Sequence, residues 1–312
     1  MTRITRLAPS PTGALHLGNA RTFLINWLLA RSEGWQIVLR IEDLDGPRVK
    51  KGADTQAIED LRWLGLDWDQ GPFYQSRRRP VYTSALDRLL ATGQAYACTC
   101  TRREVELAAS APHASDADGV YPGTCRGRYH SLDHARQDGR PAALRFAAGA
   151  QTVEFDDQFL GPHQQPMAAL GDFVIAKADG TPAYQLAVVV DDADMGITDV
   201  MRGDDLLDST PRQILLYHAL ELQPHIPRYW HLPLVKGPDG RRLAKRHGDT
   251  RLGHYRQQGV SAGRVLGLLA RWCGIEVDGI TTAADLLGHF HMDRIPRVPI
   301  IFTEADERYL LG

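Results

Sequence analysis

Two short segments carry residue types that could hold the phosphates of a nucleotide. The first reads APSPTGALHLGN over residues 8–19 and links an apolar stretch at 4–7 to a helix-like run at 19–31. The start of a helix offers backbone N–H groups and the positive end of the helix dipole to an anion. The second reads RRLAKRHG over residues 241–248 and forms a cationic loop. Together they predict a nucleotide held by backbone groups on one side and by lysine on the other.

His16, Gly18 and Lys245 are the residues in these segments best suited to that chemistry. A histidine at a helix start can donate a hydrogen bond to phosphate oxygens, and a glycine two residues later lets a flat ring approach the backbone. A His-x-Gly pattern alone is often a chance match, and a lysine in a basic loop is usually only solvated. Their occurrence together, in this order within an α/β pattern, favours the nucleotide site.

Three cysteines, Cys98, Cys100 and Cys125, form a cluster in the sequence. Three thiolates suit a tetrahedral zinc ion, which then needs a fourth ligand. Spacing alone offers three candidates for it, which are His113, Tyr121 and His130. Coordination chemistry favours a histidine, because tyrosine is an uncommon ligand. The alternative is a set of reduced, buried cysteines that hold no metal.

The composition is typical of a globular enzyme. The chain has 312 residues, of which 43% are hydrophobic and 24% charged, which is enough for a large core in one to three domains. The apolar run at 23–30 is far too short to span a bilayer, and the polar start of the chain does not resemble a signal peptide. Four cysteines do not make a disulfide scaffold in a chain of this length. We therefore expect a cytoplasmic protein with no membrane partner.

The formal net charge of -2 argues against a general polyanion binder. A basic stripe on an acidic body can still contact RNA phosphates, and residues 77–79 and 241–246 are the candidates. A solvated helix start is the simpler explanation for the arginines at 77–79.

The chain before residue 95 alternates strand-like and helix-like segments. Residues 37–41 are typical of a buried parallel strand, whereas 52–64 and 80–90 have helical character, the latter ended by Gly93. This order predicts a parallel α/β sheet with ligands at the carboxyl ends of its strands.

The pattern changes after residue 95, and we interpret 95–166 as an insertion that contains the cysteines and a loop at 108–119. The α/β pattern resumes at 173–175, 184–190 and 196–201.

A helix is predicted at 211–220, with Ser209 or Thr210 as its N-cap and Pro211 at its first position, and residues 260–272 look helical. The predicted catalytic domain consists of two halves, at 1–94 and 167–248. The insertion between them covers 95–166, and a short helical C-terminal region covers 249–312.

The two segments resemble the HIGH and KMSKS motifs of class I aminoacyl-tRNA synthetases. Longer strings resemble the glutamyl branch, and these are RLAPSPTG at 6–13, LRIEDLD at 39–45, LGLDWD at 64–69 and RGDDLLDSTPRQ at 202–213. The resemblance runs from residue 5 to about 248 and implies a Rossmann-like parallel sheet with a zinc-bearing insertion. Asn19 stands where the first motif has its second histidine, as is common in the glutamyl branch, and Ala244 replaces the serine of the second motif.

About sixty residues follow Gly248, which we interpret as too few for the helical anticodon-binding domains of a full glutamyl-tRNA synthetase. The chain therefore resembles the glutamyl-queuosine tRNA(Asp) synthetase family. That resemblance implies tRNA-independent activation of L-glutamate with ATP, and transfer of glutamate to the queuosine base of tRNA(Asp). The alternative is a minimal glutamyl-tRNA synthetase that charges the 3′ end of tRNA(Glu).

The resemblance also assigns the site residues. Glu42 matches the acid that receives the α-ammonium group of glutamate, and Arg202 is suited to a carboxylate. The implied glutamate-binding residues are Arg6, Leu7, Ala8, Pro9, Ser10, Glu42, Tyr184 and Arg202. The implied ATP-binding residues are His16, Gly18, Asn19 and Lys245, of which His16, Gly18 and Lys245 are catalytic, and Mg²⁺ accompanies ATP.

The family pattern Cys-x-Cys…Tyr-x3-Cys makes Tyr121 the fourth ligand of one structural zinc ion, beside Cys98, Cys100 and Cys125. The implied partners are ATP, L-glutamate and queuosine-containing tRNA(Asp), and we expect a monomer.

Two further classes are weighed against this assignment. A small-molecule ligase or nucleotidyltransferase could share the first loop, but the glutamyl strings and the cysteine-bearing insertion count against it. A non-catalytic tRNA-binding paralogue would be expected to have lost His16, Glu42 or Lys245, and all three are present.

Two polar groups are left outside the predicted site. The acidic run Asp191, Asp192 and Asp194 could bind Mg²⁺, but an acidic surface turn is the commoner explanation. His231 belongs to a set of histidines without metal-ligand spacing.

Overall fold

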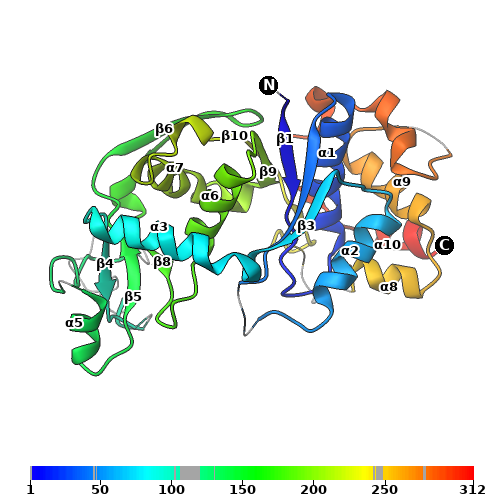
Figure 1. Ribbon diagram of the computed structural model, residues 1–312. Coiled ribbons are helices and arrows are strands. Elements are labelled where there is room, and N and C mark those ends of the chain that lie inside the picture. The colour runs from blue at the N-terminus through cyan, green and yellow to red at the C-terminus, as the bar shows by residue number, and fades with distance from the viewer. Residues whose placement is uncertain are drawn as a thin grey trace.

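The computed structural model describes residues 2–44, 46, 48–101, 103–105, 120–129, 131–241, 243, 249–276 and 279–312. Lys245 and the candidate zinc ligands His113 and His130 lie outside these ranges. Figure 1 shows two lobes side by side, with both chain ends on the same lobe.

A seven-stranded sheet forms the centre of the molecule. Its strand order is β3 (Gln70–Tyr74), β2 (Gln36–Ile41), β1 (Ile4–Leu7), β9 (Asp199–Gly203), β10 (Arg228–Leu232), β6 (Thr152–Asp157) and β7 (Gly161–Pro166). Neighbouring strands are parallel except for β6 and β7, which form an antiparallel pair at the edge. The predicted parallel α/β sheet is confirmed, with this antiparallel edge added to it.

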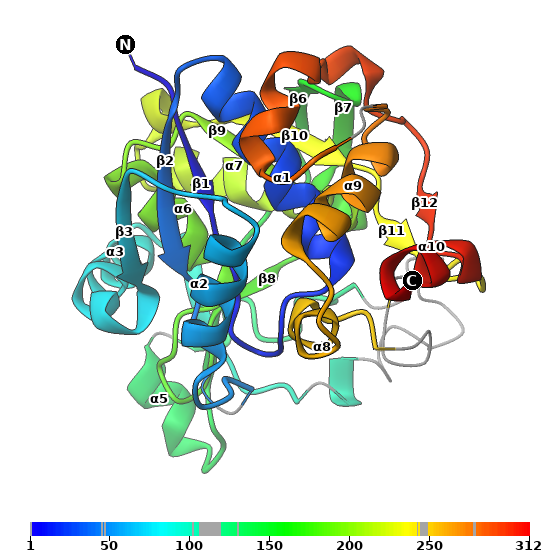
Figure 2. The same cartoon turned by 90° about the vertical axis from the view of Figure 1, so that its right-hand side faces the viewer.

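Helices cover both faces of the sheet, because successive side chains of its strands point to opposite faces. Ile37 and Leu39 of β2 belong to one core cluster with α1 (Leu17–Ser32) and α9 (Ala262–Trp272). Val38 lies between them in the sequence and belongs to a second cluster. Figure 2 shows α1 and α9 together in front of the sheet, with α6 and α7 behind it.

The remaining helices of the central part pack in the same two core clusters. The first cluster also contains residues of α2 (Ala53–Trp63), α8 (Leu252–Gln257) and α10 (Glu304–Leu311). The second contains residues of α3 (Arg79–Ala91), α6 (Tyr184–Asp194) and α7 (Ser209–Ala219). The short helix α5 (Leu132–Gln137) lies in the lobe with the cysteines.

The start of α7 differs from the prediction. The helix begins at Ser209 and its N-cap is Asp208, which makes no side-chain capping bond. The expected capping by Ser209 or Thr210 is wrong, because both hydroxyl groups bind other side chains. Thr210 Oγ1 accepts a hydrogen bond from Arg202 Nη2 at 2.7 Å, and Ser209 accepts one from a glutamine of α6.

A small antiparallel sheet lies in the second lobe. It consists of β4 (Ala95–Cys98), β5 (Ala143–Phe146) and β8 (Phe173–Ala176). The stretch 95–166 thus supplies β4 and β5 to this sheet and β6 and β7 to the central one. A parallel pair, β11 (Val235–Lys236) and β12 (Ile300–Ile301), joins the segment that follows β10 to the segment that precedes α10. Within the described part of the chain, no helix combines the length and apolar character needed to cross a membrane.

Candidate active site

A cavity of about 290 Å³ opens where β1, β2 and β9 end. Arg6 lies in β1, Glu42 directly follows β2, and Arg202 lies in β9. Ligands of parallel α/β sheets bind at this edge, the carboxyl ends of the strands. The cavity brings together most of the residues predicted from the sequence, which are Arg6, Ala8, Ser10, His16, Gly18, Asn19, Glu42, Tyr184 and Arg202.

Three predicted residues do not line this cavity or cannot be placed in it. Leu7 is completely buried and packs in the core of the first cluster. Pro9 lines a neighbouring hollow of the same loop, and its carbonyl accepts a hydrogen bond from the Glu42 N–H group at 3.1 Å. Lys245 lies outside the described residues.

His16 caps the helix that begins at the cavity. Its Nδ1 accepts hydrogen bonds from the backbone N–H groups of Gly18 at 3.1 Å and Asn19 at 3.4 Å. Because Nδ1 accepts, the neutral ring carries its proton on Nε2, which can donate to a phosphate oxygen. The expectation that free N–H groups at the start of α1 face the anion is wrong for these two groups, because the histidine ring already binds them.

The chain returns to this loop directly after the second predicted segment. Residues 244–248 lie outside the described part, but the residues that follow contact the first loop. Leu17 donates its N–H to the carbonyl of Thr250 at 3.0 Å, and Leu252 donates to Leu15 at 2.9 Å. His16 itself forms an isolated β-bridge with Arg251. The described residues 250–252, which follow the cationic loop in the sequence, therefore lie beside the first loop.

Arg202 is a buried cation with uncharged partners. Its Nε donates to Nε2 of His231 at 3.0 Å, and its Nη1 donates to Oε1 of Gln213 at 2.9 Å. Nη2 donates to Thr210, and Nη1 lies 3.4 Å from the Tyr184 hydroxyl. None of these four partners carries a negative charge, so the guanidinium keeps its full charge for a carboxylate that enters the cavity.

His231 connects Arg202 to the edge of the sheet. Its Nδ1 lies 2.6 Å from Oδ2 of Asp157, and both side chains are buried. Burial lowers the pKa of His231 against the opposing effect of Asp157, which keeps the ring neutral. Nδ1 then carries the proton that Asp157 accepts, and Nε2 is the acceptor that Arg202 needs. The sequence prediction missed this pair, because the spacing of the histidines carries no signal for it.

Glu42 is the acidic residue at the end of β2 that lines the cavity. Its Oε1 accepts a hydrogen bond from Arg40 Nη2 at 3.1 Å, and its Oε2 lies 3.5 Å from Oγ of Ser10. Burial raises the pKa of Glu42, whereas the positive charges of Arg40 and Arg6 oppose that rise. A partly buried carboxylate of this kind could accept hydrogen bonds from an ammonium group.

The acidic run of α6 is part of the same charge cluster. Arg40 lies 2.6 Å from Asp192 Oδ1 and 3.7 Å from Asp191 Oδ2, and Arg6 lies 3.6 Å from Asp192. Asp191 and Asp192 are buried. The interpretation as an acidic surface turn is therefore wrong for these two residues, because guanidinium groups inside the protein neutralise them.

The predicted metal ligands converge in the second lobe. The sulfur atoms of Cys98, Cys100 and Cys125 lie within 4.8 Å of one another. The Tyr121 hydroxyl lies 3.3 Å from Cys98 Sγ and 3.6 Å from Cys100 Sγ. Three soft sulfur donors and one oxygen are a donor set that could hold a metal ion.

The pKa values of two of these thiols shift in opposite directions, and burial raises the pKa of Cys100 to about 11. Burial raises the pKa of Cys125, but hydrogen bonds from Tyr121 and the backbone of Thr99 outweigh it and bring the pKa to about 7. Arg145 donates its Nε–H to Cys98 Sγ at 3.3 Å. Thiolates are the form that metals bind.

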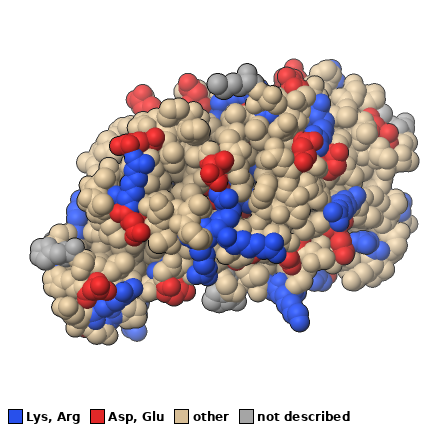
Figure 3. Space-filling view, in the orientation of Figure 1, with Lys and Arg blue, Asp and Glu red and all other residues tan. Residues whose placement is uncertain are grey.

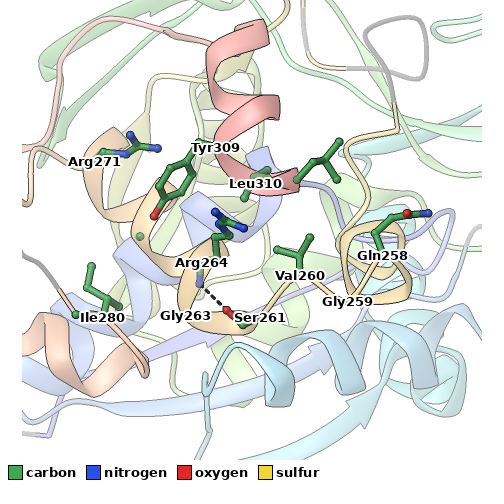
Figure 4. A pocket seen from close by; sticks show the side chains of 13 residues that line it. Gln258, Gly259, Val260, Ser261, Gly263, Arg264, Arg271, Ile280, Tyr309 and Leu310 are labelled. Atoms are coloured by element: carbon green, nitrogen blue, oxygen red, sulfur yellow. Dashed lines mark hydrogen bonds between the residues drawn. The ribbon is translucent and has the colours of Figure 1, made fainter.

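A separate hollow of about 680 Å³ lies between α9 and α10. Figure 4 shows Arg264 and Arg271 reaching toward the ring of Tyr309, with Ser261 at the start of α9. The guanidinium carbon of Arg271 lies 3.8 Å from the centre of that ring. This hollow shares no lining residue with the cavity at the strand ends.

Comparison with known proteins agrees with this geometry. A family model described as "tRNA synthetases class I (E and Q), catalytic domain" matches residues 3–297. The chain is 50% identical over 306 residues to the Glutamyl-Q tRNA(Asp) synthetase of Symbiobacterium thermophilum, a match that covers 95% of this chain and 94% of that one. It is 48% identical to the Glutamyl-Q tRNA(Asp) synthetase of Rhodopirellula baltica, over 94% of this chain and 92% of that one.

Glutamate–tRNA ligases are similar over a smaller share of their length. The ligase of Citrifermentans bemidjiense is 42% identical, over 96% of this chain but 63% of the ligase. The crystal structure of a glutamate tRNA ligase from Elizabethkingia meningosepticum in complex with its amino acid has a TM-score of 0.83 and 27% identity. That match covers 99% of this chain and 69% of the other.

Proposed function

The chain belongs to the family of class I (E and Q) tRNA synthetase catalytic domains, and we propose that it activates L-glutamate with ATP and transfers it to the queuosine base of tRNA(Asp). One cavity holds the Glu42 carboxylate and the Arg202 guanidinium, and this arrangement carries the proposal. The pair suits the ammonium group and a carboxylate of an acidic amino acid. Similarity to Glutamyl-Q tRNA(Asp) synthetases over nearly their whole length supports queuosine as the acceptor.

In the first step, the α-carboxylate of glutamate attacks the α-phosphate of ATP in line, and pyrophosphate leaves. A carboxylate is already a nucleophile, so no side chain has to remove a proton. Catalysis then consists of positioning and of stabilising the charge on the phosphate oxygens, with His16 Nε2–H and Lys245 as donors. The role of Lys245 is inferred from its motif. Mg²⁺ accompanies ATP and neutralises part of the phosphate charge.

In the second step, a hydroxyl group on the cyclopentene-diol ring of queuosine takes the glutamyl group, and AMP leaves. The partners are thus ATP, L-glutamate and queuosine-containing tRNA(Asp). We propose that the protein acts as a cytoplasmic monomer.

We propose zinc as the metal bound by Cys98, Cys100, Tyr121 and Cys125. Zinc favours four ligands that include thiolates, and four protein ligands leave no open position for a substrate. None of the four residues lines the cavity at the strand ends. The zinc ion would therefore hold the second lobe together and take no part in the chemistry.

Transfer of labelled glutamate to three purified RNAs tests the function. The RNAs are tRNA(Asp) with queuosine, the same tRNA without it, and tRNA(Glu). We expect label on the queuosine-bearing tRNA(Asp) alone. Label on tRNA(Glu) would favour a minimal glutamyl-tRNA synthetase. Absence of any glutamate-dependent exchange between ATP and pyrophosphate would overturn the activation step as well.

A further inference from the structure

A second cavity, of about 370 Å³, adjoins the cavity at the strand ends, which is the proposed glutamate pocket. The two cavities share Ser10, Glu42 and Tyr184 as lining residues. The rest of the second cavity is enclosed by residues that do not line the glutamate pocket, among them Lys177 and Ala183. A molecule in the second cavity would therefore lie next to glutamate held in the first.

We propose that the second cavity binds the acceptor nucleoside, as a base whose attached ring carries two neighbouring hydroxyl groups. This inference rests on the proposed function and assigns residues to its acceptor. The cavity volume lies at the lower end of the range for small-molecule sites, which fits one nucleoside better than a larger ligand.

The charges around the second cavity suit a nucleoside that arrives as part of RNA. Arg48 and Lys177 line this cavity but not the glutamate pocket. Gln75 also lines it and begins the short helix η1 (Gln75–Arg78), which leads into α3. The exposed side chains of Arg77 and Arg79 follow on the same segment. The positive groups that line the cavity or follow Gln75 in the sequence would attract the phosphates that flank the nucleoside.

The surface view agrees with this charge distribution. Figure 3 shows Lys and Arg side chains gathered near the middle of one face, over the start of α3 and the junction of the two lobes. An RNA loop that presents one base to the cavity could lay its backbone on this region. Of the arginines at 77–79, which the sequence leaves undecided between RNA contact and a solvated helix start, Arg77 and Arg79 are exposed, whereas Arg78 forms ion pairs with Asp191 and Asp194.

Two further side chains suit the recognition of a base. Tyr184 stands between the two cavities with 38% of its surface exposed, and RNA-binding proteins often place single-stranded bases on such aromatic rings. Gln75 donates its Nε2–H to Oδ2 of Asp191 at 2.7 Å, which fixes the amide group and leaves Oε1 as its acceptor atom.

Glutamyl-adenylate in the first cavity and the acceptor nucleoside in the second are the only reactants that the transfer step needs. The acceptor hydroxyl oxygen forms an ester bond with the carbonyl carbon of glutamyl-adenylate. The anhydride bond between that carbon and the AMP oxygen breaks, and the hydroxyl proton passes to the departing phosphate. No further reactant is required.

Two variants of the full-length protein test the assignment. Ala183→Leu adds bulk to the second cavity, and Lys177→Met removes a positive charge at similar side-chain length. Ala305→Leu, at an exposed position of α10, is the matched control for added bulk. Each protein is assayed for glutamate-dependent ATP–pyrophosphate exchange and for glutamate transfer to queuosine-bearing tRNA(Asp). Exchange needs only the first cavity, whereas transfer needs both.

We expect both cavity variants to keep exchange within about threefold and to lose transfer by about tenfold or more, with the control unchanged in both assays. Transfer at the unaltered rate in both variants would overturn the inference. An equal loss of exchange and transfer would also overturn it, because the second cavity would then belong to the activation site. Failure of the proposed function can be told apart from failure of this inference, because the unaltered protein itself would then show no exchange or no transfer.

Discussion

Arg202 donates its Nε–H group to Nε2 of His231 across 3.0 Å in the interior of the protein. The imidazole ring can accept this bond because its proton lies on Nδ1, toward Asp157, and because burial lowers its pKa. The neutral ring therefore fixes the position of the guanidinium group without cancelling its charge. We infer that His231 is a positioning residue for the proposed substrate glutamate.

We expect His231→Leu to raise the KM for glutamate in ATP–pyrophosphate exchange by about 10- to 100-fold. The reason is the loss of one hydrogen bond to a charged group, worth about 1.5–3 kcal/mol. The KM for ATP should change by less than about threefold, because the side chain of His231 bonds to Arg202, Thr210 and Asp157 and not to the predicted ATP-binding residues. Exchange kinetics with each substrate varied in turn measure both values.

His231→Gln is the matched variant for this prediction. A glutamine side chain can accept from Arg202 with its oxygen and donate to Asp157 with its nitrogen, so we expect it to restore most of the glutamate affinity. A purely structural role would instead raise both KM values together or lower the folded fraction of both variants.

We expect Gly18→Ala to lower kcat/KM for ATP by about tenfold. A Cβ atom at this position would lie 3.1 Å from Cε1 and Nδ1 of His16, so the imidazole ring would have to shift. Gly13→Ala is the control in the same loop, because nothing lies within 4 Å of a Cβ there. Alanine is a better helix former than glycine, so the melting temperature of Gly18→Ala should not fall. Equal exchange rates in both variants would contradict the proposed role of the His16 ring.

We expect the purified chain to contain one zinc ion, and Cys98→Ala to lose most of it. Loss of the ion removes several kcal/mol of stability, which corresponds to a fall of about 10 °C in melting temperature. Cys273→Ala is the control, since this cysteine is buried outside the metal cluster. Metal analysis by mass spectrometry, with thermal unfolding of the same samples, measures both effects. Full zinc content in Cys98→Ala would remove this residue from the ligand set.

We expect Lys245→Ala to reduce glutamate-dependent exchange by about 100-fold or more while leaving glutamate binding largely intact. The lysine would stabilise phosphate charge that develops during adenylate formation, and glutamate occupies a different part of the site. Lys51→Ala, at an exposed position, serves as the control. Exchange rates and equilibrium binding of labelled glutamate separate the two effects. A fully active Lys245→Ala protein would exclude the assigned role.

The sequence was most informative where local patterns decide the structure. The strand Ile4–Leu7 and the helix Leu17–Ser32, predicted at 19–31, follow from apolar runs and the bent loop between them, whereas the capping by His16 was not predicted. Glu42 and Arg202 follow from motifs at the ends of such strands. These residues meet in one cavity because parallel strands end at the same edge of the sheet.

The remaining features depend on contacts between distant residues. Asp157 and His231 are 74 positions apart, and Arg40 and Asp192 are 152 positions apart. No periodicity or motif in the sequence predicts such pairs, because only the folded sheet and α6 bring them together. The same limit explains the error at α7, where Thr210 binds Arg202 instead of capping its own helix.

The charge cluster beside the glutamate pocket is not balanced by its own members. Its positive groups are three guanidinium groups, those of Arg6, Arg40 and Arg78. They form ion pairs with four carboxylates, which are those of Glu42, Asp191, Asp192 and Asp194. The ammonium group of an amino acid placed at Glu42 would supply the missing counter-ion. The substrate would thereby bring the positive groups of this cluster level in number with its carboxylates, and glutarate, which has both carboxylates but no ammonium group, should compete poorly for the site.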